Sequence, residues 1–402
     1  MQLQKKNGEK VMQNEENKEL AQKLQYICQQ FRIPGELILH RWIPSGHINE
    51  AYYAAVYDGK EVKQFLIQKV NTYVFREPIS MMNNIELITK HIMGKERAME
   101  RRRRLHFHHT AFGHNYLVLK DGVAVNPSEA DVDWAEPGNV EFWRLYDFIE
   151  SSTSFETANG NPEVLRMSGK AFGKFNKHLQ DFDASQLVES IPHFHDTAHR
   201  LKHFFEIVER DEMGRAKDVQ AEIKLIRDNA EFGCTLCRQI EKGELPLRVT
   251  HNDTKTNNIL FDRDTLDPLV VIDLDTCMPG LACYDFGDTI RFAACTAEED
   301  QPEGMALDLN LFRAYAEGYL SEMHDILSDA EKESLVVGVA VITLELASRF
   351  LGDYLEGDKY FRIDAPDQNL RRAQAQLVLF QDMMSHLDEM KAIIRGISEN
   401  HR

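Results

Sequence analysis

The chain has 402 residues, of which 43% are hydrophobic, enough to build the core of one very large domain or of two packed lobes. Its formal net charge of −18 argues against a general nucleic-acid binder, because an acidic surface repels the phosphate backbone. We see no run that approaches the roughly 18 to 20 apolar residues of a membrane span, and no signal-peptide core near the N-terminus. The six cysteines lack the spacing of a disulfide framework. These features predict a cytoplasmic protein that binds neither nucleic acid nor membrane.

The first third of the chain has the pattern of a β-rich region. After a polar tail, residues 19–31 have the periodicity of an amphipathic helix. A second helix is predicted over residues 78–93, with Pro78 in its first turn. Asp58-Gly59 indicates a hairpin turn. Strands are predicted at 35–43, 50–57, 64–70, 105–110, 115–122 and 142–149.

From the polar turn at residues 159–163 onward, the pattern is mostly helical. A short β pair interrupts it, formed by residues 258–261 and 269–275. This change in pattern predicts three parts: a tail and helix over 1–34, a β-rich lobe over 35–150 and a helical lobe over 151–402. We found no internal repeat and no long linker.

The most informative stretch is "VTHNDTKTNNILFD", residues 249–262, which places several polar residues directly before an apolar strand. The two short strands should pair as a hairpin, because an Asp-rich turn with Pro268 separates them. Asp253 and Asn258 would then lie near Asp273, which stands at the end of the second strand. Carboxylate and amide oxygens are hard donors that suit Mg²⁺ and bound phosphates. The pattern therefore indicates a phosphoryl-transfer site.

The spacing His251-x-Asp253-x4-Asn258, followed by Asp273, resembles the catalytic loop and metal-binding aspartate of protein-kinase-like enzymes. The longer motif "HNDTKTNNILFD … VIDLDTCMPGLACYDFGD" resembles the aminoglycoside and choline phosphotransferase superfamily, and within it most of all the N-acetylhexosamine 1-kinase group. The resemblance implies an α+β, bilobal protein-kinase-like fold. It also implies that Asp253 is the catalytic base and that Asn258 and Asp273 hold Mg²⁺.

The resemblance assigns further roles around the catalytic loop. Asp285 is expected to support this loop from a following helix. His251 is expected to pack and to bond the scaffold. Lys255 has two possible roles, either to balance phosphate charge or to remain a solvated loop lysine.

The ATP-binding groups should come from the β-rich lobe. The turn "SGHIN" supplies Ser45 and Gly46 to contact phosphate, although it holds one glycine where a glycine-rich loop would hold three. Lys69, at the end of the third strand, is the lysine that the resemblance places on the α/β-phosphates. Glu86 is its expected acidic partner on the following helix, with Asn84 as a rival. Residues 146–150 are expected to be the hinge that offers backbone groups to adenine.

The acceptor pocket should lie in the helical lobe, where arginines can meet hydroxyls and aromatic rings can cover a pyranose. By the resemblance, the sugar contacts are Phe292, Arg349 and Tyr360, with His47 from the "SGHIN" turn. The alternative for the aromatic residues is a place in the core, and for Arg349 a surface ion pair.

Together these features predict an ATP- and Mg²⁺-dependent kinase, a monomer or weak oligomer, that phosphorylates the anomeric hydroxyl of an N-acetylhexosamine. One alternative is an aminoglycoside- or choline-type alcohol kinase, which an acidic acceptor pocket would indicate. The other is a pseudokinase, a binding module that keeps the fold without turnover.

Overall fold

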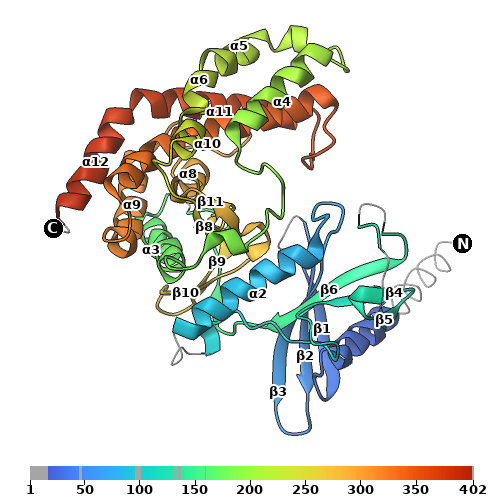
Figure 1. Ribbon diagram of the computed structural model, residues 1–402. Helices are drawn as coiled ribbons and strands as arrows, with labels where there is room; N and C mark the ends of the chain where they lie inside the picture. The colour runs from blue at the N-terminus through green and yellow to red at the C-terminus, as the bar shows by residue number, and fades with distance from the viewer. Residues whose placement is uncertain are drawn as a thin grey trace, which may run out of the picture. The chain divides into compact units, whose positions relative to one another are not determined.

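The computed structural model describes residues 17–44, 48–95, 101–129, 132–134, 137–158 and 160–400. The chain divides into two compact units. Unit 1 comprises Met1–Lys90 and Glu100–Glu150, and unit 2 comprises His91–Met99 and Ser151–Arg402. Figure 1 shows a strand-rich unit 1 in blue and blue-green and a mainly helical unit 2 in green to red. The predicted α+β composition is therefore confirmed.

Unit 1 is built on an antiparallel sheet of six strands in the order β1-β2-β3-β6-β4-β5. The hairpin predicted at Asp58-Gly59 joins β2 and β3, which pair in register from Glu50↔Lys69 to Tyr57↔Val62. The strands are β1 (Glu36–Ile43), β2 (Glu50–Tyr57), β3 (Val62–Lys69), β4 (Leu117–Lys120), β5 (Val123–Val125) and β6 (Val140–Asp147).

Two helices cover opposite faces of this sheet. The N-terminal helix, residues 17–30, packs Leu24 and Ile27 onto a face that includes Trp143 and Leu145 of β6. Because side chains alternate along a strand, Arg144 points to the opposite face, and there it contacts Met82 of α2 (Pro78–Lys95). Trp143 and Arg144, neighbours on β6, therefore face different helices.

The strand predicted at residues 105–110 is wrong. This segment forms a single bridge, Phe107↔Tyr146, to the end of β6. The reason is that β4 already pairs with residues Val140 to Trp143 of β6. Only the last few residues of β6 remain for residues 105–110 to pair with on the same side of the strand.

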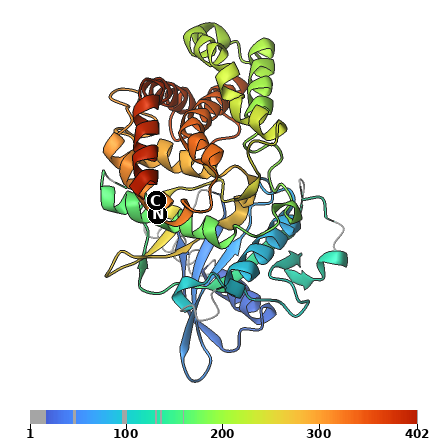
Figure 2. The ribbon, with the colours of Figure 1, turned by 60° about the vertical axis from the view of Figure 1, so that its left-hand side comes forward.

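Unit 2 holds two small antiparallel sheets among its helices. One has the order β10-β9-β7 and contains the predicted hairpin of β9 (Ile259–Asp262) and β10 (Pro268–Val271). The other pairs β8 (Arg248–Thr250) with β11 (Met278–Gly280), and β7 is Ser152–Thr153. Figure 2 shows the strands formed by residues 248–280, in yellow, beside the helices of unit 2. The longer helices are α3 (Pro162–His178), α4 (Thr197–Arg210), α5 (Gln220–Asp228), α8 (Ala282–Ala293), α9 (Leu309–Met323), α10 (Asp329–Glu356), α11 (Gln368–Ser385) and α12 (Leu387–Asn400).

Helix α10 is the central core helix of unit 2. It carries an 18-residue window of mean hydropathy 1.8. By its length and composition alone, this helix could span a membrane, and in that respect the expectation from the sequence was wrong. However, 89% of that window is buried inside the protein. The apolarity of α10 is explained by packing against α4, α8 and α11.

Candidate active site

The loop between β8 and β9 is fixed by the first turns of α8. The carboxylate of Asp285 accepts hydrogen bonds from the backbone N–H groups of His251 (2.9 Å) and Asn252 (2.8 Å). Asp288, one turn later, accepts from the N–H of Thr254 at 2.9 Å. The hydroxyl of Thr254 in turn donates to the carbonyl oxygen of Asp285 at 2.6 Å. The expected support from Asp285 is therefore present, and Asp288 is a second support that sequence reasoning missed.

His251 is a structural residue of this loop, as its pattern predicted. Its side chain is fully buried, and its Nε2 lies 2.9 Å from the carbonyl oxygen of Ile272. The rings of Phe172 and Phe175 pack edge-on against it. The imidazole therefore ties the loop to the end of β10.

Asp253 and Asn258 lie together. The side-chain amide of Asn258 donates to the carbonyl oxygen of Asp253 at 2.8 Å and to its Oδ2 at 3.1 Å. The ammonium group of Lys255 lies 3.0 Å from Asp253 Oδ1. Burial raises the pKa of Asp253, but the charges of Lys255 and His251 and the hydrogen bonds from Lys255 and Asn258 bring the pKa below its usual value. Asp253 is therefore held as a carboxylate.

Lys255 is not a freely solvated loop lysine. The nearby charge of Asp253 raises its pKa against the opposing effect of burial, and Asp288 adds to the increase. Its ammonium group also lies 5.9 Å from the ring centroid of Phe292. Phe292, predicted as a sugar contact, thus lies beside the catalytic loop.

Asp273 occupies the position expected from the hairpin. The N–H of Ile272 donates to the carbonyl oxygen of Asn258 at 2.9 Å, so Asp273 directly follows a residue that is bonded to Asn258. Its backbone is left-handed, with φ 60°, and its side chain is exposed. A carboxylate at the end of this strand is a hard oxygen donor of the kind that Mg²⁺ prefers.

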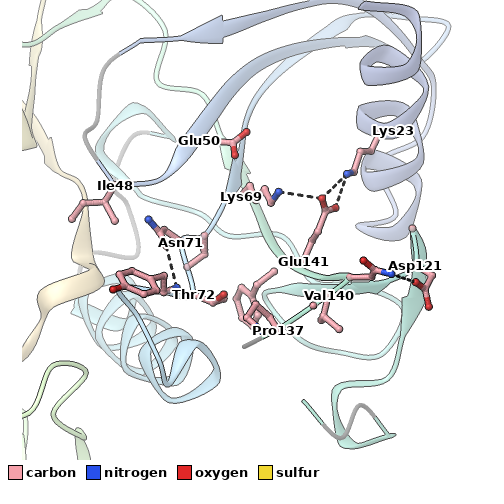
Figure 3. A pocket seen from close by; sticks show the side chains of 16 residues that line it. Lys23, Ile48, Glu50, Lys69, Asn71, Thr72, Asp121, Pro137, Val140 and Glu141 are labelled. Carbon is pink, nitrogen blue, oxygen red and sulfur yellow. Dashed lines mark hydrogen bonds and ion pairs between the residues drawn. The ribbon is translucent and has the colours of Figure 1, made fainter. Parts of the chain in front are cut away.

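Of the residues predicted around ATP, Lys69 and Glu86 are not brought together. Lys69 pairs across the sheet with Trp143 and therefore faces the N-terminal helix. There Glu141 binds both Lys69 (3.1 Å) and Lys23 (2.6 Å), as Figure 3 shows. These three side chains line a pocket of about 800 Å³.

The predicted Lys69–Glu86 pair is wrong, and Asn84 does not replace it. Glu86 lies on α2, on the opposite face of the sheet, where it binds Lys90 and lies 3.1 Å from His109. On that face the β3 residue is Gln68, which accepts a 2.8 Å hydrogen bond from Nε of Arg144. Neighbouring residues of a strand point to opposite faces of the sheet, so the residue of β3 that faces α2 is Gln68 and not Lys69.

The remaining predicted residues divide into two groups. Ser45, Gly46 and His47 lie outside the described residues. Arg349 and Tyr360 do meet: the guanidinium lies 6.0 Å from the ring centroid of Tyr360, and Tyr360 is 61% exposed. The core alternative is therefore excluded for Tyr360.

A sequence profile described as the phosphotransferase enzyme family matches residues 124–326, which is just over half of the chain. The chain belongs to this phosphotransferase family.

Solved structures of other proteins share the fold of this phosphotransferase at low sequence identity. An aminoglycoside phosphotransferase from Alicyclobacillus acidocaldarius has a TM-score of 0.55 and 11% identity, over 90% of this chain and 94% of that one. A choline kinase from Cryptosporidium parvum has a TM-score of 0.51 and 13% identity, over 89% and 92%. A microcompartment-associated aminopropanol kinase has a TM-score of 0.50 and 14% identity, over 91% and 98%. These likenesses support the protein-kinase-like fold.

A pair of side chains that sequence reasoning missed also supports the loop between β8 and β9 of this phosphotransferase. His195 lies with Nδ1 2.9 Å from Oε1 of Glu345 and with Nε2 3.4 Å from the carbonyl oxygen of Asn252. Thr197 donates its hydroxyl hydrogen to the other carboxylate oxygen of Glu345. Glu345 is a carboxylate within α10, whose apolar composition is that of a buried helix, and a charge in such a sequence was the signal that could have indicated its role.

Proposed function

We propose that this phosphotransferase moves the γ-phosphoryl group of ATP to a sugar hydroxyl, the anomeric hydroxyl of an N-acetylhexosamine. The main support is the pairing of Asp253 with Asn258 in a loop whose backbone is anchored by Asp285 and Asp288. Phosphoryl transfer depends on positioning and electrostatics, and a loop fixed at several backbone atoms provides the positioning.

Asp253 is the residue that orients the acceptor hydroxyl and receives its proton. Its lowered pKa keeps it ionised at neutral pH, so it can accept a hydrogen bond from the hydroxyl. Lys255 lies close enough to Asp253 to offset the negative charge that builds up on the transferred group. Of its two predicted roles, we therefore favour the one at the phosphate.

The donor atoms near Asp253 fit Mg²⁺. The side-chain amide nitrogen of Asn258 donates to Asp253. The Oδ1 of Asn258 forms no hydrogen bond within the described part of the chain. Together with the exposed carboxylate of Asp273, this gives two hard oxygen ligands. When bound, Mg²⁺ supplies charge neutralisation to the phosphates. The residues that would hold it are Asn258 and Asp273.

We assign ATP binding to unit 1 and the acceptor to unit 2, as the three predicted parts of the chain imply. Ser45, Gly46 and Lys69 stay proposed phosphate contacts, whereas Glu86, on the other face of the sheet from Lys69, is no longer assigned to the nucleotide site. In unit 2, Phe292, Arg349 and Tyr360 supply the aromatic faces and the guanidinium that a pyranose requires.

A kinase for a cationic alcohol is the alternative of the same reaction class. It is favoured less, because the acceptor residues of unit 2 include Arg349, whose positive charge opposes an amine. A pseudokinase is the alternative of another class, and the presence of Asp253, Asn258 and Asp273 opposes it.

The direct test is a panel of acceptors with the full chain, ATP and Mg²⁺, in which ADP release is measured and products are identified by phosphorus NMR. We expect an anomeric phosphate from N-acetylglucosamine or N-acetylgalactosamine. Turnover of choline or aminoglycosides alone would replace the proposed acceptor. Nucleotide binding without turnover of any acceptor would favour the pseudokinase.

A further inference from the structure

A small pocket in unit 2 is lined by two arginines. Arg200 of α4 and Arg349 of α10 both line it, together with Tyr360, and its volume is about 120 Å³. Pockets that enclose a whole drug-sized ligand usually measure about 300 to 1,000 Å³. This pocket therefore has the size of a subsite for one substituent of a ligand.

Within the described parts of the chain, neither guanidinium forms a direct ion pair. Across the described residues, the one hydrogen bond of Arg200 runs from Nε to the carbonyl oxygen of Phe194, at 3.3 Å. Arg349 makes ring contacts instead, with its guanidinium 5.2 Å from the ring centroid of Phe194 and 5.6 Å from that of Phe361. Most guanidinium N–H donors of both residues are therefore open to a ligand.

The two positive charges also act on each other. Burial lowers the pKa of Arg200 and the neighbouring charge of Arg349 lowers it further, against smaller opposing effects of Glu345, Tyr360 and Asp196. Two like charges in one partly buried pocket raise the free energy of the unliganded protein. An anion between them would relieve this repulsion and accept hydrogen bonds from both.

The carboxylates around the pocket are engaged elsewhere. Asp353 accepts hydrogen bonds from three backbone N–H groups of residues 359–361 and from the amide of Asn369. Glu356 binds Arg210 at 3.0 Å. Asp353 thereby holds the loop that follows α10, and Glu356 joins the end of α10 to the end of α4. The open charges at the pocket are therefore positive.

The pocket is linked to the catalytic loop within unit 2. Arg349 is one helical turn after Glu345. Burial raises the pKa of Glu345, but His195, and after it the charge of Arg349, bring this pKa below its usual value. Glu345 holds His195, which reaches the carbonyl oxygen of Asn252, the residue before Asp253. Arg349 is thus connected, through Glu345 and His195, to the backbone of the residue before the proposed base.

We propose that Arg200 and Arg349 form an anion subsite, and that the acceptor of this kinase is a sugar that carries a carboxylate or phosphate group. This proposal rests on the proposed function, because it treats the pocket as part of the acceptor site. It goes further by naming the charge of the substrate, which neutral N-acetylhexosamines lack. A guanidinium pair matches the oxygens of either anion.

The test compares sugars that differ mainly by the anion, using the full chain with ATP and Mg²⁺. The sugars are N-acetylglucosamine, its 6-phosphate and N-acetylmuramic acid, which bears a carboxylate. We expect at least one anionic sugar to have a kcat/KM about tenfold or more above that of N-acetylglucosamine. The sugar with the higher value shows whether the subsite prefers a phosphate or a carboxylate. Arg200→Gln should bring this ratio close to one. The matched control is Arg227→Gln, which removes an exposed arginine that also lies over a ring, that of Phe205, and should keep the ratio.

Thermal unfolding without ATP gives a second measurement that does not need turnover. The preferred anionic sugar should raise the Tm of the wild type and of Arg227→Gln by a few degrees, and that of Arg200→Gln by much less. A preference for the neutral sugar, or an equal loss for all sugars in Arg200→Gln, would overturn the subsite while leaving a sugar kinase in place. Failure of every anionic sugar both to react and to stabilise would also overturn it. Absence of any sugar turnover, with stabilisation by an anionic sugar, would reject the proposed reaction and keep the subsite.

Discussion

Asn258 donates two hydrogen bonds to Asp253, one to its backbone carbonyl oxygen at 2.8 Å and one to its carboxylate at 3.1 Å. The proposed metal ligand therefore also orients the proposed base. Asn258→Asp should lower kcat by 100-fold or more, because a second carboxylate would repel Asp253 and remove both hydrogen bonds. Steady-state kinetics at saturating ATP would measure this loss. In the control Asn257→Ala, where the lost amide bonds Glu156 instead, kcat should change less than about threefold. Equal losses in both variants would contradict the orienting role.

Asp253→Asn tests the base itself. The amide keeps the size of the side chain but neither accepts the proton nor attracts Lys255, so kcat should fall by about 10² to 10⁴. The Tm and the Kd for ATP should stay close to those of the wild type. Wild-type turnover in a folded Asp253→Asn protein would remove Asp253 from this role.

Asp273→Ala should abolish Mg²⁺-dependent turnover even at saturating ATP, because one of the two proposed oxygen ligands is lost. The measurement is the rate as a function of Mg²⁺ concentration. Asp264→Ala removes an exposed carboxylate from the turn of the same hairpin and should leave this curve unchanged. Recovery of the full maximum rate of Asp273→Ala at high Mg²⁺ would show that Asp273 is not a ligand.

The start of helix α10 should show a pH-dependent stability. Glu331 forms a capping box with Ser328 and binds Arg248 through both carboxylate oxygens, at 2.6 and 3.0 Å. Burial raises the pKa of Glu331, but the hydrogen bonds and charge of Arg248, with Ser328, bring it below its usual value. A depressed pKa stabilises the folded state above the unfolded pKa of about 4.3, and this contribution is lost as pH falls below it.

Glu331→Gln should therefore lower the free energy of unfolding by about 2 to 4 kcal/mol at pH 7, because it leaves Arg248 partly buried without its ion pair. Urea unfolding at pH 7 and at pH 3.5 would measure the difference from wild type. This difference should shrink at pH 3.5. A difference independent of pH would mean that the charge of Glu331 does not contribute.

The close approach of α8 and α10 depends on glycine. A Cβ at Gly338 would lie 2.4 Å from the backbone carbonyl oxygen of Cys283, on the helix that carries Asp285. Gly338→Ala should reduce the free energy of unfolding by about 1 to 3 kcal/mol and also lower kcat, because α8 must move. Gly396→Ala in α12 meets nothing within 4 Å, so it should be neutral or stabilising by up to about 1 kcal/mol. Similar Tm values for the two variants would contradict this explanation.

The sequence alone determined the features that depend on neighbouring residues. The hairpin at Asp58-Gly59 and the hairpin of β9 and β10 follow from local turn chemistry and alternation, so their positions were predicted. The loop from His251 to Asn258 was recognised because its polar residues lie within eight positions. The close pairing of Asp253 and Asn258 follows from this short separation.

Tertiary structure decided which residues far apart in the chain meet. Alternation predicts that neighbouring residues of β3 face opposite sides, but not which helix covers each side, and so the partner of Lys69 was predicted wrongly. Asp288 and Glu345 became recognisable as supports of the catalytic loop only when α8 and α10 were packed beside it. Arg200 and Arg349 are separated by nearly 150 positions, and long-range packing alone brings their two positive charges to one pocket.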